Sequence, residues 1–190
     1  MSESFIVDKE FSSIDFTKNL LPRGDYDNCT FSNCNFSNSN ISEIAFSECT
    51  FSNCDLSLIK MDKTALRDVS FKGCKLLGLF FETCNTVLFS VHFDSCNLNL
   101  CSFYQLNLKK ATFKNSSFQK ADFTEADLTS VIFEKCDLYG AIFYKTNLEK
   151  ANFKTAYNFS IDPETNRIRK AKFALQTIHG LLEKYQIEIE

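Results

Sequence analysis

Residues 121–130 read Ala121-Asp122-Phe123-Thr124-Glu125-Ala126-Asp127-Leu128-Thr129-Ser130, and this stretch contains one five-residue pattern twice. A large apolar residue stands at the centre of each unit, and a small residue stands two places before it. Residues 136–140 repeat the pattern as Cys136-Asp137-Leu138-Tyr139-Gly140. A period of five fits neither an amphipathic helix nor a simple strand. The pattern therefore predicts a coil with sides of five residues.

The same pattern extends through most of the chain. Sixteen of the 21 phenylalanines occupy the central position. Between residues 12 and 156, no Lys, Arg, Asp or Glu occupies the central position or the small position two places before it. Because charged groups are rarely buried without a partner, these two positions are expected to face the core. Phenylalanine recurs every twenty residues at Phe113, Phe133 and Phe153, so we expect four sides per coil.

One interruption shifts the pattern. Central residues carry numbers ending in 1 or 6 as far as Phe81, and numbers ending in 3 or 8 from Leu88 onward. We expect a bulge or short loop with two extra residues at 82–87, which is either a tolerated surface insertion or a recognition loop. Outward apolar residues near this slip either cover it or form a partner-binding patch. They are Leu58, Phe80, Phe89 and Leu100.

The nine cysteines suggest metal or redox chemistry at first sight, but all of them occupy the small inward position. We therefore predict that they are small core residues that alternate with alanine. His92 and His179 are far apart in sequence, and neither has a nucleophile or ligand set at a recognisable spacing. The sequence predicts no enzyme activity, no catalytic residue, no cofactor and no metal site.

The N-terminal residues lack the basic and apolar regions of a signal peptide, and no run of about 18 apolar residues occurs. We therefore expect a cytoplasmic protein that does not contact a membrane, with reduced thiols. The net charge of −3 predicts no general affinity for nucleic acid.

The C-terminal tail, residues 159–190, departs from the repeat and is expected to cap the solenoid formed by residues 1–158. Residues 162–166 have the composition of a turn, residues 174–184 predict a short helix, and residues 186–190 alternate like a strand. Gly180 predicts close packing of this helix. The helix is either a cap alone or a cap with a dimer contact, and its apolar residues are Leu175, Ile178, Leu181 and Leu182.

These repeats resemble the pentapeptide-repeat family. The resemblance implies an all-β solenoid, a right-handed quadrilateral β-helix with a short C-terminal helical cap. The tail is most similar to the Qnr/MfpA/McbG topoisomerase-protecting group. That similarity implies a non-enzymatic, DNA-mimic-like homodimer, joined through its C-terminal region. It would bind DNA gyrase or topoisomerase IV and protect the enzyme from quinolones or a peptide toxin. Many Qnr proteins carry two long loops that this chain lacks.

Acidic residues concentrate near the N-terminus. Residues 1–60 contain nine acids and four bases, whereas residues 61–160 contain ten acids and twelve bases. One group of acids falls on or beside a single side of the coil: Asp25, Asp27, Glu43, Glu48 and Asp68. These are either ordinary solvated residues or an anionic strip for a basic DNA-binding groove. The alternative function is an interaction scaffold unrelated to topoisomerases.

Overall fold

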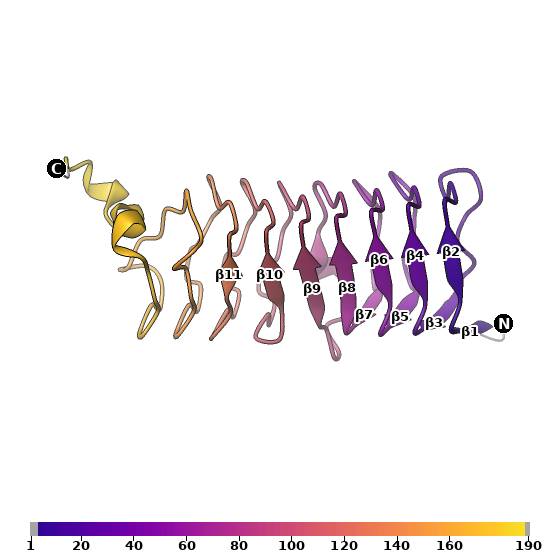
Figure 1. The fold of residues 1–190 in the computed structure, drawn as a ribbon. Coiled ribbons are helices and arrows are strands. Elements are labelled where there is room, and N and C mark those ends of the chain that lie inside the picture. Colours follow the sequence, from indigo (N-terminus) through magenta and orange to yellow (C-terminus); the bar gives the residue numbers. More distant parts are fainter. Residues whose placement is uncertain (1–3, 189–190) are drawn as a thin grey trace.

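The computed structural model describes residues 4–188 and shows a long four-walled rod (Figure 1). Two walls carry regular parallel strands. The four-stranded wall contains β1 (Ser4–Val7), β3 (Gly24–Asp27), β5 (Ala45–Ser47) and β7 (Ala65–Arg67). The seven-stranded wall contains β2 (Glu10–Ser12), β4 (Thr30–Ser32), β6 (Thr50–Ser52), β8 (Val69–Lys72), β9 (Val91–Asp94), β10 (Thr112–Lys114) and β11 (Phe133–Glu134).

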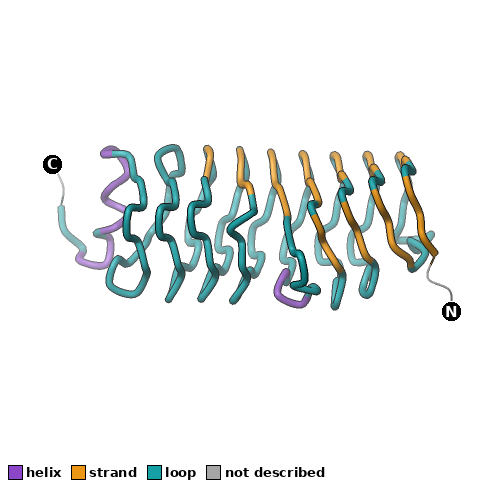
Figure 2. Tube along the Cα trace, turned by 90° about the horizontal axis from the view of Figure 1, so that it is seen from below, coloured by secondary structure: helices purple, strands orange, loops and turns teal. Residues whose placement is uncertain are grey.

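The remaining two walls, called the third and fourth walls in chain order, are held by isolated parallel bridges. Examples are the bridges from Asn35 to Asp55 and from Ser102 to Asp122, each joining residues twenty positions apart. Strands are concentrated in the N-terminal coils, and most C-terminal coils consist of turns and single bridges (Figure 2). The predicted β-solenoid with four sides of five residues is confirmed.

Stacked phenylalanine rings fill the interior along the whole seven-stranded wall. Neighbouring ring centroids are 4.7 to 6.0 Å apart, which suits offset stacking at the rise of one coil. Apart from Phe113 and Phe133, whose rings are tilted by 33°, neighbouring rings are stacked along this series: Phe11, Phe31, Phe51, Phe71, Phe93, Phe113, Phe133, Phe153 and Phe173. A shorter stack in the fourth wall joins Phe81, Phe103, Phe123 and Phe143.

Different residues determine the backbone conformation at the corners and within the walls. At most corners, the residue two places after the central one has a positive φ, as at Asn53 and Gly73, where Asn and Gly tolerate this conformation well. Within a wall, an Asn or Asp just before the central residue often accepts a hydrogen bond from the backbone N–H two residues later. The Asp127 carboxylate accepts in this way from Thr129 at 3.1 Å and closes a turn. Thr50 occupies the equivalent place in strand β6.

The two extra residues lie later than predicted, within residues 86–90 rather than 82–87. Asn85 still pairs with Ala65, twenty residues earlier, whereas Val91 pairs with Val69, twenty-two residues earlier. The segment from Phe81 to Thr83 forms a 3-10 helix, η1, and stays within the original register.

The insertion also exchanges the expected core residue. The pattern placed Leu88 inward, but Leu88 is 70% exposed, and Phe89 packs against the core instead. The Phe89 ring lies 6.4 Å from the ring of Phe81. The larger aromatic side chain removes more apolar surface from water, which explains the exchange. Phe89 therefore does not belong to an exposed patch, contrary to the prediction.

The coil continues beyond residue 158, where the sequence predicted its end. Asn152 forms a parallel bridge to Lys172, and the Phe153 and Phe173 rings stack at 5.2 Å. In the altered unit between them, Phe159 and Ile161 provide the buried side chains.

The tail forms the predicted turn, and its helix is of the 3-10 type. The Glu164 N–H donates to the Asp162 carboxylate at 2.9 Å. The helical segments are η2 (Leu175–Leu181) and η3 (Glu183–Tyr185). The close packing expected at Gly180 is confirmed, since a Cβ there would collide with the Phe159 carbonyl oxygen. Residues 186–188 form no strand, and residues 189–190 of that prediction lie outside the described residues.

Candidate functional site

The cysteines line the interior of the rod. All nine cysteines are buried and free, as the core prediction required. Burial raises the pKa of Cys49, Cys84, Cys101 and Cys136 to about 12, so these groups are thiols at neutral pH. Within residues 4–188, no group of three His, Cys, Asp or Glu side chains is placed to hold a metal ion. Every helix in this part of the chain is too short or too polar to span a bilayer.

His92 joins three successive coils on the outside of the rod. Its Nε2 lies 2.7 Å from the Asp68 carboxylate, and its Nδ1 lies 3.1 Å from the Thr112 hydroxyl. This set has the residue types of a hydrolytic triad. However, Thr112 stands exposed on the outside of the seven-stranded wall, where it is open to water. We therefore interpret the contacts as structural links between coils.

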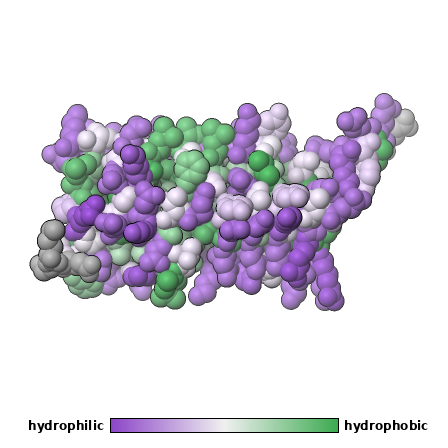
Figure 3. Space-filling model, turned by 180° about the vertical axis from the view of Figure 1, so that it is seen from behind, coloured by the Kyte–Doolittle hydropathy of each residue, from purple (hydrophilic) through white to green (hydrophobic). Residues whose placement is uncertain are grey.

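An apolar corner lies between the third and fourth walls. Leu58 and Leu100 are each 54% exposed and Phe80 is 59% exposed, as the sequence predicted for an outward cluster. Gly78 lies between the two leucines, and the Leu58 side chain lies beside it. A hollow of about 220 Å³ opens between Leu58 and Phe80. Figure 3 shows hydrophobic residues gathered along one edge of the rod.

The two leucines of this apolar corner have an unfavourable backbone conformation. Their φ angles are 56° for Leu58 and 61° for Leu100, and a bulky residue is uncommon in this region. One coil before Leu58, Asn38 fills the same corner position with a residue that tolerates it.

The predicted acidic group is divided between two corners. Glu43 precedes strand β5 and its carboxylate pairs with Arg23 at 2.6 Å, whereas Glu48 follows the strand at the opposite corner. Asp25 and Asp27 are half-buried in β3. Asp68 remains 68% exposed while it contacts His92.

A charged corner runs the length of the rod between the four-stranded and seven-stranded walls. Backbone hydrogen bonds join each coil to the next beside this corner: the Glu48 N–H donates to the carbonyl of Arg67, the residue before Asp68, at 2.9 Å, and the Lys150 N–H donates to the carbonyl of Arg169, the residue before Lys170, at 3.0 Å. The residues of the charged corner, in coil order, are Asp8, Asn28, Glu48, Asp68, Ser90, Lys110, Ser130, Lys150 and Lys170. The sign of the charge therefore changes from negative to positive at the insertion.

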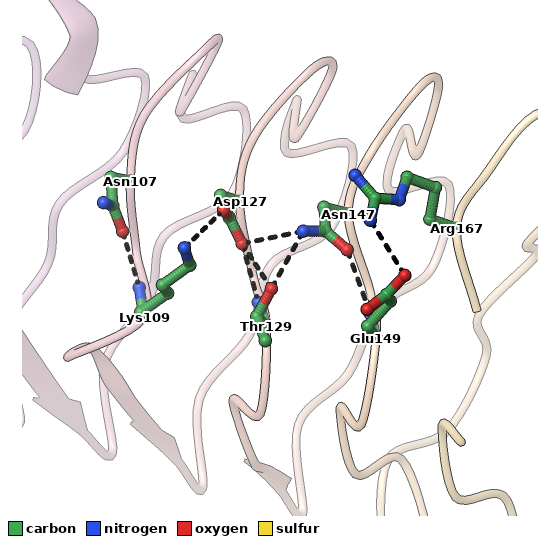
Figure 4. A network of polar contacts seen from close by, with 7 residues as sticks. All are labelled: Asn107, Lys109, Asp127, Thr129, Asn147, Glu149 and Arg167. Atoms are coloured by element: carbon green, nitrogen blue, oxygen red, sulfur yellow. Dashed lines mark hydrogen bonds and ion pairs between the residues drawn. The ribbon is translucent and has the colours of Figure 1, made fainter. Parts of the chain in front are cut away.

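The basic half of the charged corner is free of ion pairs within the described chain. Lys110, Lys150 and Lys170 are exposed, and no carboxylate of residues 4–188 lies within 4.0 Å of their amines. Neighbouring cations on the adjoining wall are paired, as Figure 4 shows for Lys109 with Asp127 and for Arg167 with Glu149.

The charged corner was not predicted from the sequence. Its signal is present in the outward positions, but it emerges only when these positions are aligned every twenty residues and corrected for the insertion. Asp8, Lys110, Lys150 and Lys170 then form one line with Glu48 and Asp68.

The predicted dimer residues of the tail are unequally exposed. Leu175 is 82% exposed, whereas Leu181 packs against the core and Ile178 and Leu182 are half-buried. The Lys184 amine lies 2.7 Å from the carboxylates of both Asp162 and Glu164 and ties the end of the tail to the turn.

Comparison with known proteins supports the architecture. The family described as pentapeptide repeat region matches residues 25–90 and 86–157. No curated protein sequence matched the chain. A trypsin-treated variant of QnrB1, a plasmid-mediated fluoroquinolone resistance protein, superposes with a TM-score of 0.71 and 16% identity, over 98% of this chain and 92% of that one.

A second solved structure has a similar fold and a different description. HetL from the cyanobacterium Nostoc sp. strain PCC 7120 is a pentapeptide repeat protein involved in heterocyst differentiation regulation. It superposes with a TM-score of 0.68 and 18% identity, over 90% of this chain and 87% of that one. At these identities, the likenesses establish the fold alone.

Proposed function

The chain belongs to the pentapeptide-repeat family, and from this premise we propose that it binds DNA gyrase or topoisomerase IV through its acidic coils. Bound there, it would protect the enzyme from a quinolone or a peptide toxin. Proteins of this family are generally non-enzymatic scaffolds, so the action is binding and not catalysis. The fold shared with QnrB1, a fluoroquinolone resistance protein, supports the choice of partner.

The density of acidic groups on the N-terminal coils carries this proposal. Asp8, Glu48 and Asp68 lie on the charged corner, and Asp25 and Asp27 lie on the adjoining wall. These five carboxylates span four coils, or about 14 Å of rise at ~4.8 Å per coil. One DNA strand places about four phosphates over the same length. A basic groove that accepts DNA would therefore meet a comparable charge density.

A supercoiling assay tests the proposal. A bacterial DNA gyrase is assayed with and without ciprofloxacin, and with and without a peptide poison, while the protein is titrated into the micromolar range. We expect the protein to restore supercoiling in the presence of one poison. The variant D25N/D27N/E48Q/D68N should lose this effect, because it removes four of the five acidic charges.

The matched control is D62N/E125Q/E183Q/E188Q, which removes the same number of charges at exposed sites away from the charged corner. It should protect like the wild type. If the wild type neither protects nor inhibits at any concentration, the topoisomerase proposal is wrong.

A protein scaffold unrelated to topoisomerases is the second candidate, and the apolar corner favours it. Exposed Leu58, Phe80 and Leu100 offer hydrophobic contact area that an anionic DNA mimic does not need. The leucines retain a costly backbone conformation where Asn or Gly would be easier, which suits a binding role. Loss of binding to an isolated partner in L58D/L100D, with binding kept in the acid-neutralised variant, would support this function.

We expect either function to operate in the cytoplasm, where the nine buried thiols would stay reduced. The dimer through the C-terminal region stays a prediction that rests mainly on Leu175. The other three predicted contact residues contribute to the cap or are half-buried.

A further inference from the structure

We propose that the charged corner is a self-complementary interface, on which a second copy of this chain docks antiparallel to the first. Self-association of this kind does not depend on the partner proposed above. It follows from the order of charges along the rod.

A two-fold axis at the insertion brings the acidic half of the charged corner onto the basic half of the second copy. Counted outward from Ser90, Asp68 meets Lys110 of the second copy, and Asp8 meets Lys170, four coils from the centre. The intermediate positions bring Glu48 to Ser130 and Asn28 to Lys150. Each contact occurs twice because the interface is isologous. No two like charges meet along the corner.

On the seven-stranded wall, the row of outward residues next to the corner is also complementary under this two-fold axis. Its paired positions run from Glu10 through His92 to Lys172, and the two ends carry opposite charges. Antiparallel docking places Glu10 against Lys172 of the second copy. None of the positions between them is an Asp, Glu, Lys or Arg: they are Thr30, Thr50, Ser70, His92, Thr112, Ile132 and Asn152.

On the four-stranded side of the corner, the outward residues that directly precede the corner residues limit the contact. There the same symmetry would bring Arg67 to Lys109 and Asp27 to Glu149, which repel in pairs. The proposed contact therefore lies on the corner and on the edge of the seven-stranded wall. It does not extend across the four-stranded wall.

The insertion supplies an apolar centre. Leu88 is 70% exposed and belongs to the coil that the proposed axis crosses. Leu88 borders an open hollow of about 520 Å³, which is also lined by Glu48, Asp68 and Lys110. A protruding leucine beside a hollow can pack into the hollow of the second copy. In this interface the two extra residues have a binding role, whereas a merely tolerated insertion would have none.

The expected affinity is modest. Eight coil steps of ~4.8 Å give a strip about 38 Å long, and at a width of about 13 Å it buries roughly 500 Å² on each copy. That area is at the low end for specific complexes, and exposed ion pairs are screened by salt. We therefore expect a dimer that forms at micromolar concentrations in low salt and dissociates in high salt.

Sedimentation equilibrium of the full chain at about 20 mM and about 500 mM salt tests the proposal. The single reversals D68K and K110D should each weaken the dimer at least about tenfold, because each creates two repulsions at the axis. The double reversal D68K/K110D should restore the dimer. Because D68K also removes the contact to His92, this restoration separates pairing across the interface from damage within one chain.

The matched control is K145D, which makes the same change of charge at an exposed corner after the fourth wall and should dimerise like the wild type. A chain that stays monomeric in low salt at every concentration overturns the proposal. So does a dimer that K110D leaves intact and that L175E dissociates, since the tail would then form the interface. These outcomes are read from the mass of the particle, so they are obtained independently of the gyrase assay.

Discussion

The coils before and after the insertion share a core and differ in almost everything outside it. Strands β1–β8 lie in the N-terminal coils, whereas the C-terminal coils after β9 contain short strands, bridges and side-chain-closed turns (Figure 2). The charged corner is acidic before the insertion and basic after it. Both halves contain the same stacked phenylalanines. The interior therefore fixes the coil, while the backbone of each wall and its surface charge are free to vary.

The shared core predicts that truncating equivalent core residues in the two halves lowers the free energy of unfolding equally. Phe51 and Phe133 stack in opposite halves, and each is at most 1% exposed. We expect F51A and F133A to lower the free energy of unfolding by a similar amount, about 3–5 kcal/mol. Urea denaturation measures both. The exposed control F80A should change stability by less than about 0.5 kcal/mol. A loss in one half only would show that the halves do not share one core.

The next largest loss of stability is expected at the C-terminal end of the rod. Gly180 packs against Phe159, and the Gly180 carbonyl accepts a hydrogen bond from the Ile161 N–H at 2.8 Å. In G180A the added methyl group has no space, so we expect a loss of about 1–3 kcal/mol, concentrated in residues 159–188. Amide hydrogen exchange locates the loss. Faster exchange throughout the N-terminal coils would contradict a local role for this cap.

A smaller effect distinguishes the two kinds of wall. The Asn147 amide donates to Asp127 and Thr129 and accepts from the Glu149 N–H (Figure 4). We expect N147A to lower the free energy of unfolding by about 1 kcal/mol, since two hydrogen bonds between neighbouring coils and one within the turn are lost. The comparison variant T50A, in strand β6, should cost less than about 0.5 kcal/mol. Equal costs would mean that the side-chain bonds do not stabilise the C-terminal walls.

The smallest expected effect is the response of the tail to acid. Hydrogen bonds from Lys184 lower the pKa of both Asp162 and Glu164 below their ordinary values. A carboxylate with a lowered pKa in the folded state stabilises that state above its unfolded pKa. This contribution is lost as the pH falls through the folded pKa. Hydrogen exchange of residues 159–185 should therefore accelerate, beyond its intrinsic pH dependence, below about pH 4. In K184M this additional acceleration should be absent, and its persistence there would assign it to other groups.

The sequence was sufficient to predict the interior. A position that must be apolar or small on every side leaves a signal at period five, and identical residues such as Phe113 and Phe133 reveal the twenty-residue coil. The cysteines follow the same rule, because all nine stand at the small position. Packing in a narrow interior constrains these residues more strongly than any other demand on the chain.

The irregular segments could not be placed in the same way. At the insertion, either Leu88 or Phe89 could face inward, and only the packing against Phe81 decides between them. Beyond Phe153 the pattern is broken by Phe159, which sits one residue out of register and hides the last coil. The charged corner was missed because outward residues carry no periodic constraint of their own.

The longest stack of aromatic rings has a mechanical consequence. The Phe71 and Phe93 rings lie 5.2 Å apart across the insertion, the same spacing as between Phe51 and Phe71 one coil earlier. Strands β8 and β9 also pair over four residues at this point. The extra residues therefore loop out without softening the rod beneath them. Under bending or tension, the solenoid should respond as one stiff beam with no hinge at its middle, so its two ends stay at a fixed separation.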